Sequence, residues 1–404
     1  ETILPAIQHK NAELRNASEP TETAPGYSGD RYCPDCDKVV EKGYTYWNED
    51  NLTWKLDADG KLTISGTGAM KNYDIENNKS PVFKNSNVKK VVIEDGVTSI
   101  GAYAFYSCDN SISITIPSSV TSIGDSAFAA CGLTSITIPS SVTSIGDFAF
   151  NSCGSLTSIT IPDSVTSIGS YAFTSCSSLT SITIPDSVTS IGDWTFYNCS
   201  SLPSITIPDS VTSIGDSAFA YCERLTSITI PDRVTSIEPY AFRDCKSLTS
   251  ITIPDGVTSI GNYTFYNCSS LTSITIPDSV TSIGDSAFYY CTSLTSITIP
   301  DSVTSIGKSA FYYCTSLTSI TIPDSVTSIG KSAFSGCSSL KTISLSCGSA
   351  LKRSDFGDQA NLVSYTNQHL LTKTEAKAAT CTEDGNIEHW TCEHCKKYFL
   401  SDDA

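Results

Sequence analysis

Cysteine and histidine side chains near the C-terminus have the types and spacing of zinc ligands. A C-x-x-C knuckle follows a third cysteine eleven residues upstream and a histidine before that, and the four residues are His369, Cys381, Cys392 and Cys395. Four such ligands suit tetrahedral Zn²⁺. His389 and His394 are alternative ligands, and a disulfide or unused thiols are alternatives to the metal. We predict a structural zinc module here, because so short a segment with few large apolar residues scarcely folds without a metal ion or a covalent cross-link.

A degraded copy of the same pattern stands near the N-terminus. Cys33 and Cys36 form its C-x-x-C knuckle. His9 holds the place of His369, and Glu22 stands where the C-terminal copy has a cysteine. A carboxylate in place of a thiolate lowers the affinity for zinc, so a disulfide or no bond at all is as good an interpretation as metal. Neither copy shows a general base beside an open coordination position, and we expect that the protein requires no cofactor for catalysis.

A column of aspartates is the other candidate for chemistry. Each one follows a proline, and the eight residues are Asp163, Asp186, Asp209, Asp232, Asp255, Asp278, Asp301 and Asp324. Two carboxylates about 5 to 5.5 Å apart would suit a retaining glycosidase. Eight equivalent copies instead indicate a residue that caps a repeated turn, with a cation-binding ridge as the alternative. All four histidines lie outside this region, and no phosphate loop, nucleophile elbow or metalloprotease helix occurs, so we expect no enzyme.

The elements that carry these aspartates are copies of one unit. Cysteines at one position measure the period, which is 23 residues with one step of 22: Cys108, Cys131, Cys153, Cys176, Cys199, Cys222, Cys245, Cys268, Cys291, Cys314 and Cys337. Such spacing is typical of a repeat protein, in which stacked units bury one continuous core. We interpret these cysteines as buried free thiols rather than disulfides, because stacked units place them side by side.

Each unit predicts one coil of a solenoid. In one copy, Ile159 and Ile161 alternate with an outward threonine, which indicates a short strand that Pro162 ends. The sequence VTSI then predicts a second extended run, Gly169 opens a corner, and a helical or 3₁₀ turn follows. The glycine column fails once, at Glu238, so the corner does not strictly require a positive φ. The last element carries a column of phenylalanines, Phe105, Phe128, Phe150, Phe173, Phe196, Phe219, Phe242, Phe265, Phe288, Phe311 and Phe334.

The unit LxxIxIPxxVxxIGxxAFxxC resembles the BspA-like leucine-rich-repeat family of bacterial surface proteins over residues 88–350. We therefore expect a β-rich leucine-rich-repeat solenoid with short parallel strands and a helical or 3₁₀ turn in each coil. The resemblance also implies a curved right-handed solenoid, an extracellular or cell-surface location, and adhesion to host proteins or other cells. The C-terminal module is similar to small cysteine-containing modules that flank repeats in gut bacterial surface proteins.

Four segments follow from these patterns. They are residues 1–47, a degraded Cys/His module and linker; 48–87, a β-hairpin cap; 88–350, the solenoid with its C-terminal cap unit; and 351–404, a tail with the second Cys/His module. The hairpin is indicated by alternating Leu52, Trp54 and Leu56, followed by Leu62 and Ile64 after an Asp-Gly turn. A cap is needed because a bare solenoid end exposes its core and strand edge.

Charge and hydropathy limit the classes of partner. The formal net charge is -17, which repels nucleic acid and anionic membranes. No run of 18 or more apolar residues occurs, so we expect no membrane-spanning segment. The chain opens with Glu1 and shows no apolar leader, so a signal peptide, if there was one, has been removed.

Recognition is expected where the copies differ, next to the phenylalanine column. Aromatic residues gather there, and we predict a ligand-binding edge formed by Trp194, Tyr197, Tyr221, Tyr240, Tyr263, Tyr266, Tyr289, Tyr290, Tyr312 and Tyr313, near Phe148 and Tyr171. The alternative is that these rings only roof the core. A second candidate surface is the outward hydroxyl column Thr160, Thr183, Thr206, Thr229, Thr252, Thr275, Thr298 and Thr321, which could also simply stabilise the sheet.

The sequence thus predicts a secreted or cell-surface bacterial recognition protein. It would bind proteins or glycans of a host or a neighbouring cell through many weak contacts, and we expect it to be a monomer. One rival is a passive spacer that presents another domain. The other is a polysaccharide-acting enzyme, which would need a pocket that regular units do not provide.

Overall fold

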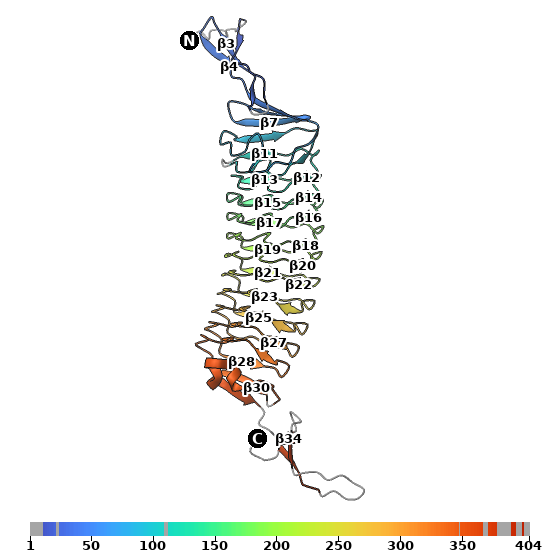
Figure 1. The fold of residues 1–404 in the computed structure, drawn as a ribbon, viewed down its shortest axis with the longest axis vertical. Coiled ribbons are helices and arrows are strands. Elements are labelled where there is room, and N and C mark those ends of the chain that lie inside the picture. The colour runs from blue at the N-terminus through green and yellow to red at the C-terminus, as the bar shows by residue number, and fades with distance from the viewer. Residues whose placement is uncertain are drawn as a thin grey trace, which may run out of the picture. The chain divides into compact units, whose positions relative to one another are not determined.

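The computed structural model describes residues 11–21, 24–108, 112–346, 348–366, 371–377, 389–392 and 398–399. The chain divides into two compact units, residues 1–210 and residues 211–404. Each unit contains coils of the repeat, and the described strands of each unit appear as two series in Figure 1.

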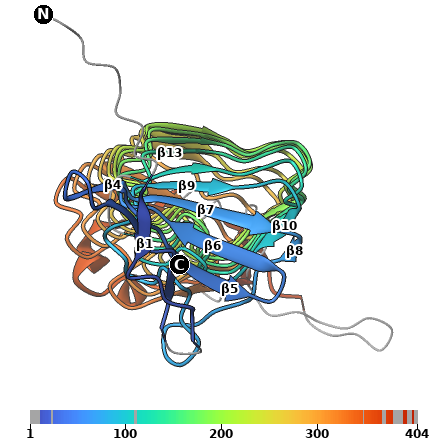
Figure 2. The ribbon, with the colours of Figure 1, turned by 90° about the horizontal axis from the view of Figure 1, so that it is seen from above.

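A mixed sheet of six strands opens the solenoid of the first unit, in the order β11-β9-β7-β6-β5-β2. The strands are β2 (Gly26–Tyr27), β5 (Thr45–Glu49), β6 (Leu52–Leu56), β7 (Lys61–Gly66), β9 (Lys90–Ile93) and β11 (Ser113–Thr115). The predicted hairpin is confirmed, because β6 and β7 pair antiparallel, and β5 extends it on the other side of β6. Strand β9 then pairs with β7 in parallel, so the cap hairpin also begins the parallel ladder (Figure 2).

The cap closes the core with one large side chain. Trp54 on β6 is completely buried and packs against Tyr73 and Phe105, with ring centroids 6.2 and 5.8 Å away. Before the cap, a small antiparallel sheet has the order β1-β3-β4. Its strands are β1 (Glu13–Arg15), β3 (Asp30–Cys33) and β4 (Lys38–Glu41).

Two short strands recur in each coil of the first unit. The first series continues from β11 with β13 (Ser135–Thr137), β15 (Ser158–Thr160), β17 (Ser181–Thr183) and β19 (Ser204–Thr206). The second series is β8 (Gly68–Ala69), β10 (Val97–Ile100), β12 (Ser122–Ile123), β14 (Ser144–Ile145), β16 (Ser167–Ile168) and β18 (Ser190–Ile191). Pairing is parallel and in register, as in Ile136 with Ile159 and Ile159 with Ile182. The predicted parallel solenoid is confirmed.

The second unit repeats this arrangement. Its first series is β21 (Ser227–Thr229), β23 (Ser250–Thr252), β25 (Ser273–Thr275), β28 (Ser319–Ile322) and β30 (Thr342–Ser346). Its second series is β20 (Ser213–Ile214), β22 (Ser236–Ile237), β24 (Ser259–Ile260), β26 (Ser282–Ile283), β27 (Ser305–Ile306) and β29 (Ser328–Ile329).

The segment after residue 350 begins with one more coil. A 3₁₀ helix, η1 (Arg353–Leu362), leads to β31 (Val363–Thr366), which pairs with β30 in parallel. Phe356 of η1 is buried and stacks on Phe334 with centroids 6.3 Å apart, so it covers the end of the phenylalanine column. The strands β32 (Leu371–Thr374), β33 (His389–Cys392) and β34 (Tyr398–Phe399) form a separate antiparallel sheet.

The phenylalanine column is the centre of the core in both units. Its members are at most 2% exposed. Neighbouring rings are nearly parallel, with centroids 5.4 Å apart for Phe150 and Phe173 and 5.2 Å apart for Phe288 and Phe311. Because each ring lies between two others, the core is continuous along each unit.

Each member of the phenylalanine column is here called a spine phenylalanine. The segment around it is a series of hydrogen-bonded turns rather than a helix. In one coil, the amides of Tyr171, Phe173 and Ser175 donate to carbonyls of the next coil at 2.7 to 2.9 Å. The intervening amides of Thr174 and Cys176 donate to carbonyls three residues earlier, at 3.1 and 3.2 Å. The predicted 3₁₀-type bonds are therefore present, but alternate amides leave the coil. Tyr171 and Ser175 have left-handed backbones, with φ of 61° and 59°, and this prevents a continuous helix.

The cysteine column supplies hydrogen-bond donors to the core. The Sγ of Cys176 donates to the carbonyl of Phe150 at 3.2 Å, and Cys268 donates to Phe242 at the same distance. The same carbonyls also accept the amide of the cysteine three residues later, so each buried oxygen has two donors. The prediction of buried free thiols is confirmed for Cys108 to Cys337, and the thiols do more than fill space.

The glycine corners need small side chains rather than an unusual backbone. A Cβ on Gly169 would lie 2.4 Å from the backbone nitrogen of Asp147 in the preceding coil. None of the corner glycines in the described coils has a positive φ. The prediction from Glu238 is confirmed, because close approach of successive coils, not a left-handed φ, selects glycine here.

The first prediction concerns the phenylalanine column. Phe265→Ala should lower the free energy of unfolding by about 3 to 5 kcal/mol, because it leaves a cavity between Phe242 and Phe288. Thr275→Ala, an exposed change in the following strand, should alter it by no more than about 0.5 kcal/mol. Urea denaturation of the two variants measures both values, and equal losses would contradict the role of the column.

The second prediction concerns alkaline pH. Burial raises the pKa of Cys153 from its ordinary value of 9.0 to about 12, and raises those of Cys176 and Cys268 as well. Unfolded thiols therefore ionise at a lower pH than folded ones, so stability is full below pH 9 and falls as the pH rises from about 9 towards 12. Thermal melting at pH 7 to 11 measures the decline. Native thiols should also resist alkylation at pH 8, and rapid labelling of the folded chain would show that the column is accessible.

Candidate functional site

The ten predicted binding residues, here called the aromatic edge, all flank the spine phenylalanines. Trp194, Tyr240 and Tyr263 come two residues before a spine phenylalanine. Tyr221, Tyr290 and Tyr313 come two residues after one, and both sets have left-handed backbones. Tyr197, Tyr266, Tyr289 and Tyr312 directly follow one. The turns that bury the phenylalanines therefore also direct these side chains to one edge of the coils.

In the first unit, the edge is a stack of three rings from successive coils. Tyr171 stacks on Phe148 with centroids 4.4 Å apart and on Trp194 with centroids 5.6 Å apart, each pair 11° from parallel. Tyr197 packs against Trp194 at 4.4 Å. The predicted residues Trp194 and Tyr197 are thus brought together with two aromatic neighbours.

In the second unit, the tyrosines form longer columns. Tyr289 lies between Tyr266 and Tyr312, with centroids 4.9 and 4.7 Å away. Tyr240 and Tyr263 make a second stack, 4.8 Å apart and 3° from parallel. A third pair, Tyr290 and Tyr313, is 5.1 Å apart and runs beside the first column. All eight predicted tyrosines of this unit are described, and seven of them make these ring pairs.

The stacking decides which part of each ring a partner can reach. Faces are covered by neighbouring rings, so mainly ring edges and hydroxyl groups are left. Tyr290 and Tyr313 are 36% and 39% exposed, and the other rings of the aromatic edge are half-buried. Burial raises the pKa of Tyr266 and of Tyr289, so their hydroxyls are protonated at neutral pH and can donate hydrogen bonds. The edge therefore both roofs the core and offers polar groups.

The predicted binding residues leave out one residue that lies among these rings. Arg243 directly follows a spine phenylalanine, at the position that Tyr266 has in the next coil. Its guanidinium carbon lies 5.4, 5.8 and 5.1 Å from the ring centroids of Tyr221, Tyr240 and Tyr266. The sequence could have indicated this residue, because most other coils have an aromatic or small residue directly after the spine phenylalanine.

The outward threonines are exposed, and all of them except Thr298 lie in the first series of strands. Among the described residues, no hydrogen bond involves the side chains of Thr160, Thr252 or their equivalents. The threonine three residues earlier in each repeat behaves differently. Thr157 and Thr249 donate hydrogen bonds to carbonyls of the preceding coil at 3.1 and 3.3 Å. The outward hydroxyls are thus available to a ligand, whereas the other column stabilises the stack.

The aspartate column does not cap the turns as expected. Ser164, next to Asp163, donates to the carbonyl of Val142 at 2.6 Å, and the amide of Val165 closes the turn. No hydrogen bond of the described residues reaches the eight carboxylates except at Asp324, which accepts one from Ser346. The capping interpretation is wrong, because the carboxylates are exposed and accept no hydrogen bond from a turn amide of the described residues. The following serine instead bonds the preceding coil in five of the eight cases, at Ser164, Ser187, Ser210, Ser279 and Ser302.

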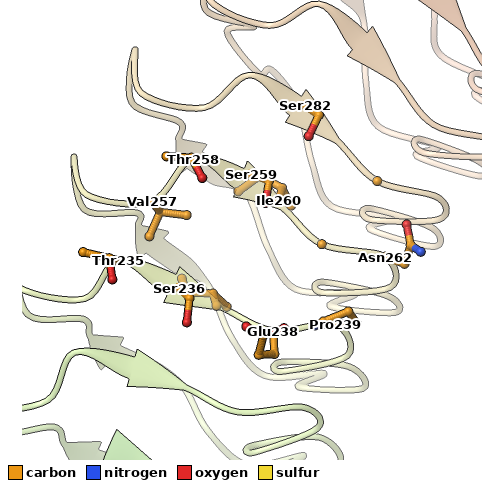
Figure 3. A pocket seen from close by; sticks show the side chains of 13 residues that line it. Thr235, Ser236, Glu238, Pro239, Val257, Thr258, Ser259, Ile260, Asn262 and Ser282 are labelled. Carbon is orange, nitrogen blue, oxygen red and sulfur yellow. The ribbon is translucent and has the colours of Figure 1, made fainter. Parts of the chain in front are cut away.

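Two hollows lie over the strands of the second unit. One of about 350 Å³ lies over β22, β24 and β26, where Glu238 and Pro239 replace the usual corner glycine and its neighbour (Figure 3). Its lining contains hydroxyl side chains such as Thr258 and Ser259, and Glu238 is its single titratable group. The second, of about 400 Å³, contains Asp301 and Asp324 of the aspartate column.

The predicted zinc ligands cannot be placed. His369, Cys381 and Cys395 lie outside the described residues, as does the side chain of Cys392 in β33. No group of three or more metal-ligating side chains gathers within the described residues.

The N-terminal knuckle is only partly described. Cys33 ends β3 and Cys36 lies in the β3–β4 turn. They are not joined by a disulfide, and a hydrogen bond with Cys33 is the main cause that raises the pKa of Cys36. His9 and Glu22 lie outside the described residues. The zinc module therefore stays a prediction. In the described part of the chain, no helix is long and apolar enough to cross a membrane.

Solved structures that are similar to this chain include bacterial leucine-rich proteins. A leucine-rich repeat protein from Bacteroides ovatus is 30% identical, with 80% of this chain and 100% of that chain covered and a TM-score of 0.49. A leucine rich cell surface protein from Faecalibacterium prausnitzii is 33% identical, with coverages of 80% and 98% and a TM-score of 0.48. The pneumococcal vaccine antigen PcpA is 22% identical, with coverages of 79% and 92% and a TM-score of 0.50. No curated protein matches the chain.

The family model for the BspA type leucine rich repeat region matches residues 76–201, 143–272 and 258–379. These ranges cover most of the chain and include the cysteine, phenylalanine and threonine columns described above. The chain belongs to the BspA-type leucine-rich-repeat family.

Proposed function

We propose that this chain is a secreted or cell-surface recognition protein. It binds proteins or glycans of a host or a neighbouring cell through the aromatic edge. The family supports this location, and the relative from Faecalibacterium prausnitzii is described as a cell surface protein. The function is one of binding rather than catalysis.

The observation that carries the proposal is the stacking of variable residues into continuous surfaces. Core positions are nearly identical between coils, but the positions beside the spine phenylalanine vary. There the copies place Tyr266, Tyr289 and Tyr312 in one column. Tyrosine and tryptophan are enriched at binding hot spots, because they offer a large contact area at little cost in conformational entropy.

The free threonine hydroxyls are a second candidate surface. Successive coils present them at the spacing of neighbouring strands, about 4.8 Å. Repeated weak contacts of this kind raise avidity when the partner is itself repetitive. A repetitive glycan fits this surface better than a single folded protein does.

The rival functions have less support. A polysaccharide-acting enzyme needs two carboxylates flanking the scissile bond. The hollow at Glu238 holds a single titratable group. The two carboxylates of the other hollow, Asp301 and Asp324, are equivalent members of the repeated aspartate column rather than a distinct pair. A passive spacer would give no reason for aromatic side chains at positions that serine or glycine occupies in other coils, as at Ser286 and Gly336.

A binding screen tests the recognition function. The chain is applied to arrays of extracellular-matrix proteins and glycans beside a variant in which Tyr266, Tyr289, Tyr290, Tyr312 and Tyr313 are alanine. We expect specific binding that the variant loses, because the largest part of the aromatic edge is gone.

A matched control replaces Thr252, Thr275 and Thr298 on the outward sheet face by alanine. Binding that survives the tyrosine changes but not the threonine changes would move the site to the sheet face. No binding by a folded sample, as judged by circular dichroism, would favour the spacer.

The zinc module is a separate proposal, which the full chain tests directly. We expect one equivalent of zinc in the purified protein, measured by mass spectrometry of the metals, and its loss in a Cys392→Ser, Cys395→Ser variant. The Cys33→Ser, Cys36→Ser variant is the control and should keep the metal. A chain purified with zinc present that retains none contradicts the proposal.

A further inference from the structure

Basic residues are unevenly distributed along the repeats. Between residues 112 and 340 they are Arg224, Arg233, Arg243, Lys246, Lys308 and Lys331. The first four fall within one period of the repeat, in a chain whose net charge is -17. The same coil replaces the corner glycine with Glu238, so it departs further from the consensus than its neighbours do.

Arg243 is the centre of this coil's contribution to the aromatic edge. Tyr221, Tyr240 and Tyr266, from three successive coils, surround its guanidinium at 5.1 to 5.8 Å. Its side chain is 34% exposed. A guanidinium enclosed by aromatic rings is held in a narrow range of orientations while one part remains in contact with solvent.

A buried carboxylate fixes this orientation. The Nε of Arg243 donates to Oδ2 of Asp244 at 3.2 Å, and the Nδ2 of Asn267 donates to Oδ1 of the same carboxylate at 2.6 Å. Asp244 is only 6% exposed. Within the described residues, the two terminal nitrogens of Arg243 make no hydrogen bond. Those nitrogens form the planar pair of donors that binds a carboxylate through two parallel hydrogen bonds.

The charges close to Arg243 in the sequence are balanced, unlike those of the chain as a whole. Lys246 pairs with Glu223 at 2.7 Å. Arg224 is exposed and makes no ion pair among the described residues. Over residues 223–246, four basic side chains balance four acidic ones, which are Glu223, Asp232, Glu238 and Asp244. This stretch therefore lacks the negative excess of the chain as a whole and repels a negatively charged partner group less.

We propose that Arg243 and its three tyrosines form the anchoring site for a carboxylate of an acidic peptide segment in a partner protein. The inference rests on the proposed recognition function and adds the class of partner. A peptide is favoured over an acidic sugar, because the faces of Tyr240 and Tyr266 that would stack on a sugar ring are turned to Tyr263, Tyr289 and the guanidinium. Arginine and tyrosine together are typical of hot spots in protein interfaces.

Fluorescence polarisation with labelled peptides tests the site. The probe is a twelve-residue peptide of alternating glutamate and glycine, and its glutamine analogue is the neutral control. We expect the full chain to bind the glutamate peptide at least about tenfold more tightly than the glutamine peptide at low salt, which corresponds to one charge-assisted contact.

The variants separate a fixed guanidinium from charge alone. Arg243→Gln combined with Asp244→Asn removes both partners of the pair, so no buried carboxylate is left unpaired, and it should abolish the preference. Arg243→Lys keeps the charge without the planar donors and should reduce it severalfold. Arg233→Gln is the matched control, because Arg233 is an exposed arginine of the same coil in the turn between β21 and β22. It should leave binding unchanged.

Several results would overturn the proposal. Equal binding of the two peptides, or an equal loss in the Arg233→Gln and double variants, would show that no carboxylate site exists at Arg243. Tighter binding of polygalacturonate than of the glutamate peptide would make the ligand an acidic glycan. If the array screen finds tyrosine-dependent partners while the peptides do not bind, this inference fails and the recognition function stands.

Discussion

The structure depends on the hydrogen bonds that alternate amides around each spine phenylalanine send to the next coil. In the turn from Tyr171 to Cys176, every second amide leaves its own coil, and the others close short local turns. This alternation holds neighbouring coils at a fixed spacing and buries the phenylalanine between them. It also requires left-handed backbones two residues before and two residues after the phenylalanine. Six of the ten side chains of the aromatic edge come from those two positions.

The left-handed positions connect stability with the proposed recognition surface. A residue other than glycine in this conformation costs about 1 to 2 kcal/mol, and each described coil contains such residues. Stacked aromatic pairs contribute about 0.5 to 1.5 kcal/mol beyond the area they bury, so columns such as Tyr240 with Tyr263 offset part of that cost. Serine or glycine takes these positions in other coils, as at Ser286 and Gly336, which shows that the fold itself does not require a ring. The rings are therefore the part of the turn that is open to specialisation.

Patterns of local origin could be predicted well from the sequence. The strands, the β6–β7 hairpin and the phenylalanine and cysteine columns all follow from residue types at a constant period. The turn was predicted in part, because its bonds within the coil are local but its bonds to the next coil are not. The role of Ser164, rather than Asp163, in the strand-ending turn was missed for the same reason, since its acceptor is the carbonyl of Val142 in another coil. The terminal metal ligands remain predictions of the sequence alone.

The sequence by itself determined the period, the columns and the family, because each of these is a property of one unit and of its repetition. Only the tertiary structure decided which side chains meet. Tyr266 and Tyr289 are 23 residues apart in the chain and 4.9 Å apart as rings, and Arg243 contacts tyrosines of three coils. The physical reason is that the spacing between parallel strands, about 4.8 Å, is also the distance at which planar rings stack. Residues that are unrelated in the chain thus become neighbours once the coils are in register.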